Sequence, residues 1–169
     1  MEFIIIFCAE YLFLVNVAIL LFYFIHLWLQ QKATFLSRFK LIAVTFPLIF
    51  LASRIAGYYI YDPRPFVLQH IHSLITHAAD NGFPSDHMLL TTAIASAVFA
   101  YNRKLGVLLF VSALIVGVAR VLALVHQPID IIGSILIAMG VTKIILLIKF
   151  KHFSKSTQSL ASIRTTRSK

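Results

Sequence analysis

The chain has 169 residues, enough for one domain but not comfortably for two. Hydrophobic residues make up 60% of it and charged residues only 12%, whereas a soluble domain usually has about half apolar and about a quarter charged residues. Such a shortage of charge excludes an ordinary water-exposed surface. The net charge of +9 does not indicate nucleic-acid binding, because the basic residues lie between and after long apolar runs.

Five apolar runs follow one another, each close to the roughly 20 residues that a membrane-spanning helix needs. They cover approximately residues 3–29, 41–61, 85–101, 105–125 and 128–148. The sequence therefore predicts an all-α integral membrane protein, a bundle of about five transmembrane helices. It divides the chain into a transmembrane domain, residues 1–149, and a basic tail, residues 150–169.

A polar segment, residues 62–86, separates the second run from the third and is rich in Pro, His and Asp. Its middle, residues 66–78, predicts a short interfacial helix in this loop. The three histidines of the segment, His70, His72 and His77, lack the carboxylate support and clear ligand spacing of a metal site. We expect them to be ordinary interfacial residues, and we expect neither a metal ion nor another cofactor.

The distribution of the basic residues predicts the orientation of the chain in the membrane. Five spans put residues 30–40, 102–104 and the tail on one side, together with eleven of the fifteen Lys and Arg residues. The positive-inside rule makes that side, and hence the tail, cytoplasmic. The polar segment and the link at residues 126–127 then face outward. Three arginines lie at or near this outer end, and so do all six acidic residues. This combination indicates a functional site.

Three short stretches converge on the outer end. Asp62-Pro63-Arg64-Pro65 follows the second run, Pro84-Ser85-Asp86-His87 opens the third, and Arg120, His126 and Asp130 bridge the fourth and fifth. Glu10, the only charge in the first run, is expected to make a buried polar contact near the outer surface or to touch the site.

The arginines and Ser85 suit a phosphate group. A transferring phosphoryl group spreads negative charge over its oxygens, and the planar forks of Arg64 and Arg120 each match two of them. Pro84 suits the first turn of a helix, which would direct free backbone N–H groups and the Ser85 hydroxyl at an anion. These residues predict a phosphate cradle.

The histidines suit covalent catalysis without a metal. Asp130 falls in the first turn of a helix that Pro128 should begin, from where it reaches back to one imidazole nitrogen of His126 and leaves the other free to attack. His87 is available to protonate the leaving oxygen. The prediction is a nucleophile, its orienting carboxylate and a general acid.

Here the sequence resembles the type 2 phosphatidic acid phosphatase superfamily. The motifs of that family are Lys-x6-Arg-Pro, Pro-Ser-Gly-His and Ser-Arg-x5-His-x3-Asp; this chain has Arg64-Pro65, residues 84–87 and Arg120-x5-His126-x3-Asp130. The run 77–87 is similar to the bacitracin-resistance type of undecaprenyl diphosphate phosphatase. The resemblance implies that His126 is the nucleophile, His87 the acid and Asp130 the orienter, and that Arg64, Arg120 and Ser85 hold phosphate.

Three positions depart from the family pattern. Gly57 stands where the first motif has Lys, and Arg54 is a candidate to supply that charge to the phosphate. Ala119 replaces the Ser before Arg120. Asp86 replaces Gly, and its carboxylate next to a phosphate would need a local partner or a proton.

The resemblance implies a metal-independent hydrolase in the bacterial cytoplasmic membrane. It would convert undecaprenyl diphosphate to the monophosphate through a phosphohistidine, recycling the lipid carrier of peptidoglycan synthesis at an outward-facing site. The alternatives are a broader phosphatase for phosphatidic acid, phosphatidylglycerophosphate or lipid A phosphate, and a non-catalytic binder or transporter of lipid phosphates. The sequence leaves the oligomeric state open.

Overall fold

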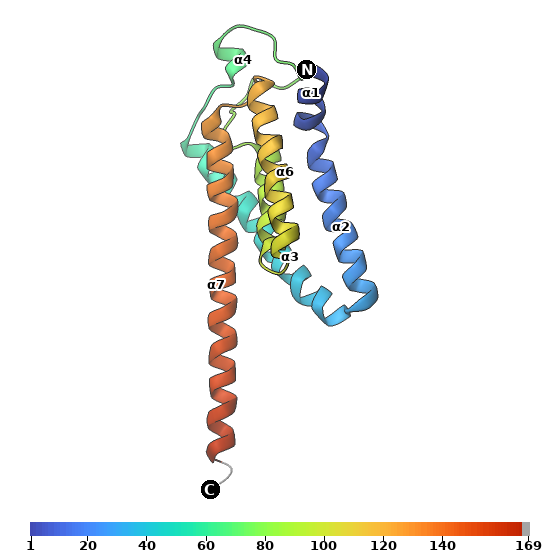
Figure 1. The fold of residues 1–169 in the computed structure, drawn as a ribbon. Coiled ribbons are helices and arrows are strands. Elements are labelled where there is room, and N and C mark those ends of the chain that lie inside the picture. The colour runs from blue at the N-terminus through green and yellow to red at the C-terminus, as the bar shows by residue number, and fades with distance from the viewer. Residues whose placement is uncertain (167–169) are drawn as a thin grey trace.

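The computed structural model describes the backbone of residues 1–166 and the side chains of residues 1–149 and 151. Over this part the chain is helical and has no strand beyond an isolated bridge between Pro63 and Asn81. The helices run up and down beside one another (Figure 1). In chain order they are α1 (Glu2–Glu10), α2 (Leu12–Gln30), α3 (Lys32–Tyr59), α4 (Pro65–Leu68), α5 (Asp86–Phe99), α6 (Arg103–Leu122) and α7 (Pro128–Thr166).

Four of the described helices are long and apolar enough to cross a membrane, namely α2, α3, α6 and the Pro128–Lys149 part of α7. The fifth apolar helix, α5, has 14 residues and is mostly buried inside the bundle. The outer faces of the long helices expose many large aliphatic and aromatic side chains, as expected where lipid replaces water. The prediction of a helical multi-pass membrane protein with about five spans is confirmed.

Helix α5 lies at the centre because its side chains are small. Ala93, Ala95 and Ala97 are almost completely buried and let neighbouring helices approach closely, as small residues do in membrane bundles. The turn into α6 is equally tight. A Cβ atom at Gly106 would lie 2.4 Å from the Cα atom of Phe99, so only glycine lets this turn close. The tight turn fixes α6, which carries Arg120, against α5, which carries His87.

The first predicted span is divided in two. Helix α1 ends at Glu10 and α2 begins at Leu12, with Tyr11 between them at φ −115° and ψ −25°. Helix α1 packs against α6 instead of simply prolonging α2. A buried Arg120 explains the break in part, because its Nη1 donates to the Ala9 carbonyl at 3.0 Å.

The short helix predicted in the polar loop is present, but it is α4 and ends at Leu68 instead of near residue 78. Beyond it the chain turns at His70, which has a φ of 53°. The Leu74 amide then donates to the Ala123 carbonyl at 3.2 Å. The loop therefore packs over the link between α6 and α7 instead of continuing as a helix, and it brings residues 77–82 over that link.

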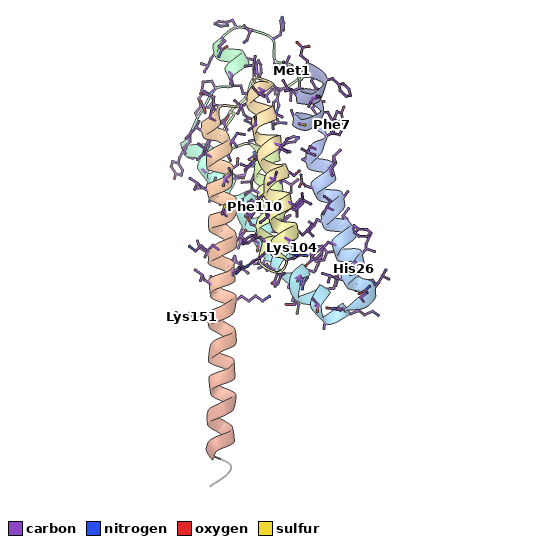
Figure 2. The ribbon with its side chains drawn as sticks, in the orientation of Figure 1. Met1, Phe7, His26, Lys104, Phe110 and Lys151 are labelled. Atoms are coloured by element: carbon purple, nitrogen blue, oxygen red, sulfur yellow. The ribbon has the colours of Figure 1, made fainter. Side chains whose placement is uncertain are left out.

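The connectors lie at two opposite ends of the bundle. The N-terminus, the loop that contains α4 and the α6–α7 link lie at one end, which we call the loop end (Figure 1). Figure 2 shows Met1 and Phe7 toward that end and Lys104, His26 and Lys151 toward the other, the basic end. Helix α7 continues past the bundle to Thr166, so the backbone of most of the predicted tail prolongs this helix. Residues 167–169 of the tail lie outside the described part.

Candidate active site

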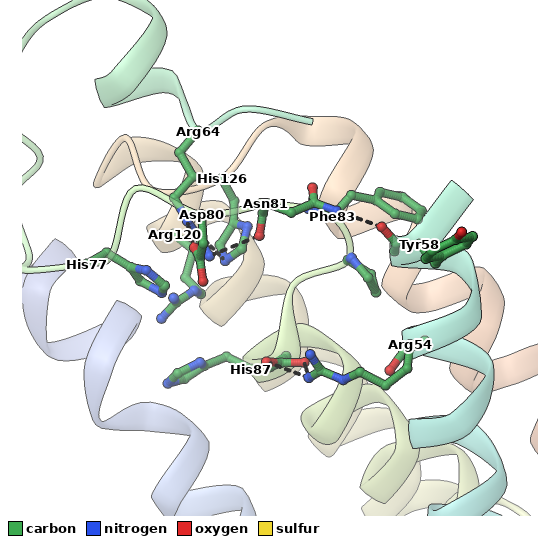
Figure 3. Close-up of a pocket in the computed structure, with 14 residues that line it drawn as sticks. Arg54, Tyr58, Arg64, His77, Asp80, Asn81, Phe83, His87, Arg120 and His126 are labelled. Atoms are coloured by element: carbon green, nitrogen blue, oxygen red, sulfur yellow. Dashed lines mark hydrogen bonds and ion pairs between the residues drawn. The ribbon is translucent and has the colours of Figure 1, made fainter. Parts of the chain in front are cut away.

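A cavity of about 470 Å³ opens at the loop end (Figure 3). Five of the seven predicted site residues line it, namely Arg54, Arg64, His87, Arg120 and His126. The other two, Ser85 and Asp130, are fully buried and do not line the cavity themselves. The structure therefore gathers residues from positions 54 to 130 around one space.

The hydrogen bonds of His126 define its tautomer. Its Nδ1 atom lies 3.1 Å from Asp130 Oδ2, and its Nε2 atom lies 3.3 Å from Arg64 Nη1. A guanidinium group only donates and a carboxylate only accepts, so Nε2 is the acceptor and Nδ1 carries the proton. The lone pair of Nε2 thus faces Arg64 Nη1 in this structure, and it becomes available to a substrate when that hydrogen bond is given up.

His126 is also held in its uncharged form. It lies in the link between α6 and α7, and only 2% of its surface is exposed. Burial is the main cause that lowers the pKa of His126 well below its usual value, and the charges of Arg120 and Arg64 add to it. A neutral imidazole has the free lone pair that nucleophilic attack requires.

Asp130 fixes this imidazole from the first turn of α7, which begins at Pro128 as predicted. The Asp130 Oδ2 atom accepts a second hydrogen bond, from the Gln127 amide at 2.8 Å. Two donors therefore hold one carboxylate oxygen in place. Because the side chain is completely buried, water does not compete for the same oxygen.

Arg64 ties three segments of the chain together. Its Nε atom donates to Asp80 at 2.8 Å, its Nη1 to the Val125 carbonyl at 2.7 Å, and its Nη2 to the Asn81 carbonyl at 3.3 Å. The side chain is 5% exposed. This arginine is thus preorganised beside His126, and it also holds the loop and the α6–α7 link in position.

Arg120, in the last turn of α6, is equally buried. One of its nitrogens is bound to Ala9, and its Nε atom has no partner among the described residues. The carboxylates of Glu10 and Asp86 lie close enough to interact with its charge. Glu10 itself is half-buried, makes no side-chain hydrogen bond in the described structure and does not line the cavity, so neither of the two contacts expected for it is seen.

Helix α5 directs its N-terminus at the cavity. It begins at Asp86 with Ser85 as N-cap, so Pro84 precedes the helix instead of occupying its first turn. The Ser85 Oγ atom is buried without a hydrogen-bond partner in the described structure. His87 is half-buried in the first turn, where the Phe13 ring of α2 packs edge-on against it with 4.5 Å between ring centroids. The free N–H groups and the dipole of this helix end favour a bound anion.

Arg54, the candidate for the missing lysine charge, pairs with Asp86, one of the departures from the family motifs. Arg54 Nη2 donates to both carboxylate oxygens of Asp86, at 3.0 and 3.2 Å. Asp86 thus has the local partner that it was expected to need. Gly57 allows the end of α3 to approach the loop, because a Cβ atom there would lie 2.9 Å from the Phe83 carbonyl oxygen. A lysine at this position would require the loop to move.

Two residues of the site, His77 and Asn81, were assigned no chemical role from the sequence alone. His77 lines the cavity 6.1 Å from His126, measured between ring centroids, and burial together with Arg64 and Arg120 lowers its pKa. Asn81 links the loop to the end of α3 by donating to the carbonyls of Gly57 and Ile60. The only sequence signal for both was their place in the run 77–87.

His70 and His72 are exposed and do not line the cavity, in contrast to His77. Within the described residues, no group of three or more His, Cys, Asp or Glu side chains is arranged to hold a metal ion. The three loop histidines therefore do not gather at one site in the described part of the chain.

Solved structures show the same fold. The crystal structure of Aquifex aeolicus LpxE superposes with a TM-score of 0.68, covering 86% of this chain and 87% of that one, at 21% identity. At this identity the likeness concerns the fold alone.

Sequence comparison gives the family. The pattern of the PAP2 superfamily matches residues 55–154, well over half of the chain. The chain therefore belongs to the PAP2 superfamily, and the suspected resemblance is confirmed.

Three curated relatives share part of the sequence. The chain is 43% identical over 79 residues to the undecaprenyl-diphosphatase BcrC of Bacillus subtilis, and 38% identical over 77 residues to the bacitracin transport permease protein BcrC of Bacillus licheniformis. It is 34% identical over 99 residues to the putative undecaprenyl-diphosphatase YbjG of Escherichia coli. The matches cover 47%, 45% and 58% of this chain and 41%, 38% and 50% of those relatives. They thus span about half the length of the relatives, or less.

Proposed function

We propose that this chain is a lipid phosphatase that hydrolyses undecaprenyl diphosphate to undecaprenyl phosphate. The observation that carries the proposal is the buried His126–Asp130 pair beside two buried arginines on the wall of one cavity. The names of two relatives, both undecaprenyl-diphosphatases, support the choice of substrate. A protein that only binds lipid phosphates would need the arginines but not an oriented, neutral imidazole.

In the first step, His126 Nε2 attacks the terminal phosphorus of the diphosphate. A P–N bond forms while the bond from phosphorus to the bridging oxygen breaks, and His87 gives its proton to that oxygen as undecaprenyl phosphate leaves. Arg64 and Arg120 stabilise the charge on the transferring group from the cavity wall, and Ser85, buried next to that wall at the N-terminus of α5, is a further proposed donor. The negative charge of the bound diphosphate favours the protonated form of His87 that this step requires.

In the second step, His87 accepts a proton from a water molecule that attacks the phosphohistidine. The P–N bond breaks, inorganic phosphate leaves, and the electron pair returns to His126. Guanidinium groups supply the positive charge in both steps, so the mechanism needs no metal ion and no other cofactor.

Arg54 is placed in this scheme as the ligand of the second phosphate. It lines the same cavity as His126 and His87 but comes from α3, a different wall from the one that carries Arg64. A diphosphate that extends from His126 past His87 would bring its inner phosphate within reach of the exposed Arg54–Asp86 pair. A phosphatidic acid has no second phosphate to use this contact.

The site is proposed to face outward from the bacterial cytoplasmic membrane. The basic end carries Lys32, Arg38, Lys40, Arg103, Lys104 and Lys149, and the sequence has no acidic residue near these positions. The positive-inside rule assigns that end, with the tail from residue 150 onward, to the cytoplasm. An outward site suits a lipid carrier that is released at the outer leaflet.

A substrate panel tests the proposed function. Purified protein, assayed with a chelator present throughout, should release phosphate from undecaprenyl diphosphate with a kcat/KM about 10- to 100-fold above that for phosphatidic acid. This is the effect of one added charge-assisted hydrogen bond of about 1.5–3 kcal/mol. Arg54→Gln should remove most of the preference. Because it also leaves Asp86 without its partner, phosphatidic acid turnover should fall as well, but by less than undecaprenyl diphosphate turnover.

Other outcomes of the panel would redirect the proposal. A strong preference for phosphatidic acid, phosphatidylglycerophosphate or lipid A phosphate would indicate the broader phosphatase. Complete loss of activity in chelator, restored by one divalent ion, would contradict the metal-free mechanism. Tight binding of every substrate with no phosphate release would identify a binder or transporter.

A further inference from the structure

Two carboxyl groups meet behind His126, and the mechanism above uses only one of them. Asp130 lies in the first turn of α7, and Asp62 lies in the loop two residues before Arg64. Both residues lie against Gly82 of the loop, and both bind Gln127. Gln127 bridges them, since its side-chain amide donates to Asp62 Oδ1 and its backbone N–H donates to Asp130 Oδ2.

The remaining oxygen of each carboxyl group is buried and has no hydrogen-bond partner among the described residues. These atoms are Asp62 Oδ2 and Asp130 Oδ1. A buried polar atom without a partner is costly, and two ionised carboxylates in contact repel each other. A single proton held between the two groups removes both penalties, as it does in other carboxyl pairs.

The surroundings decide which residue carries the proton. Asp130 Oδ2 accepts hydrogen bonds from His126 Nδ1 and from the Gln127 amide, and the Arg64 charge acts on the same group. The Asp62 carboxyl group accepts only the bond from the Gln127 side chain in the described structure. Hydrogen-bond donors and cations stabilise the ionised form, so the charge belongs on Asp130 and the proton on Asp62.

Gly82 lies directly against both Asp62 and Asp130. A Cβ atom at Gly82 would lie 3.0 Å from Asp130 Oδ2 and 3.0 Å from the Asp62 carbonyl oxygen, so the bare backbone covers both residues. The Gly82 amide donates to that carbonyl at 2.8 Å, and Asn81 Oδ1 accepts from the Asp62 amide at 2.9 Å. The loop thus fixes Asp62 against α7.

We propose that Asp62 is a positioning residue whose protonated carboxyl group donates a hydrogen bond to Asp130. The bond holds Asp130 Oδ2 on His126 Nδ1 and leaves the pair a single negative charge. Asp62 would act on the chemistry only through Asp130 and would not touch the substrate. This role rests on the proposed function, because it presumes that His126 reacts.

A protonated Asp62 makes turnover dependent on pH. Burial, the charge of Asp130 and the hydrogen bond to it raise the pKa of Asp62. The groups that face the pair are His126 and Gln127 from the link and Arg64 from the loop. As the pH rises through the raised pKa, Asp62 loses its proton, the pair acquires a second negative charge, and the hydrogen bond is lost. Turnover should therefore fall on the alkaline side.

Two substitutions of Asp62 test this role. In Asp62→Asn the amide donates to Asp130 and its oxygen accepts from Gln127, as the protonated acid does. This variant should retain most of the wild-type kcat and lose the part of the alkaline decline that belongs to Asp62, so that only the decline caused by deprotonation of His87 remains. Asp62→Ala should lower kcat by about 10- to 100-fold with little change in KM, because the imidazole is displaced. An Asp62→Asn variant as slow as Asp62→Ala, or one with an unchanged alkaline decline, would overturn the proposal.

Infrared spectroscopy tests the proton itself, without any turnover. With only six acidic residues in the chain, the carbonyl stretch of one protonated carboxylic acid is open to assignment in an ester-free detergent. Wild-type protein at a pH below the alkaline decline should show this band, Asp62→Asn should lack it, and Asp80→Asn should keep it. A wild-type spectrum without the band, or a band that persists in Asp62→Asn, would refute the assignment even if His126 proves essential. Failure of the proposed function would instead show as a His126 variant that folds and keeps its turnover.

Discussion

Replacing His126 with alanine should lower phosphate release from undecaprenyl diphosphate by about 10⁴-fold or more, because it removes the proposed nucleophile. The imidazole is the only one in the described structure that is hydrogen-bonded to a buried carboxylate. Initial rates of phosphate release from purified protein in detergent give the measurement. Binding of the substrate should persist, since Arg64 and Arg120 remain.

The control for this variant must separate chemistry from folding. His126→Asn can still donate toward Asp130, so it preserves the buried contact while it removes the nucleophile. His72→Ala changes an exposed histidine of the loop and should keep wild-type turnover. If either His126 variant folds and turns over within about tenfold of the wild type, the residue is not the nucleophile.

The second large effect is expected at His87, whose removal should slow turnover of the lipid diphosphate by about 10²- to 10⁴-fold. A general acid matters only where the leaving oxygen needs a proton. His87→Gln should therefore lose much less activity toward an aryl phosphate whose leaving group departs as a stable anion. Parallel rate measurements on the two substrates check this.

The comparison with His126 makes the leaving-group test specific. A nucleophile variant should be slow with both substrates, whereas an acid variant should be slow mainly with the poor leaving group. Equal losses of His87→Gln on the two substrates would show that His87 serves binding or packing, for instance through its contact with Phe13.

The gathering of the motif residues was predictable because each lies at the end of a recognisable apolar run. Positions 64, 87, 120 and 126 were assigned to one face of the membrane by counting spans, and the cavity collects them there. The hydrogen bond from His126 to Asp130 follows from a spacing of four residues across a helix start that Pro128 marks. Such local geometry depends on few neighbours.

Other features depended on contacts that no short spacing reveals. The break at Tyr11 accompanies an arginine more than 100 residues away that binds the Ala9 carbonyl. Helix α4 ends at Leu68, and the loop beyond it binds the α6–α7 link. The Arg54–Asp86 pair joins the candidate for the missing lysine charge to a departure from the family motifs, and the two had been considered separately. Each of these requires the packed bundle.

The roles of Asp62 and Gln127 were hidden for the same reason. Asp62 is adjacent to a motif and Gln127 follows the proposed nucleophile, but neither has a spacing that indicates chemistry. Only the fold brings the two side chains together against Asp130. A motif search weighs residue types one segment at a time and therefore misses a carboxyl pair formed by two segments.

The most direct measurement is to trap the covalent intermediate. Protein mixed with undecaprenyl diphosphate labelled in its terminal phosphate should be quenched within one turnover and mapped by peptide mass spectrometry. The label should be found on His126, in a form that is labile in acid and stable in alkali, as expected for a phosphorus–nitrogen bond, and it should be absent from His126→Asn. Label on another residue, or turnover with no protein-bound phosphate at any quench time, would contradict the phosphohistidine mechanism.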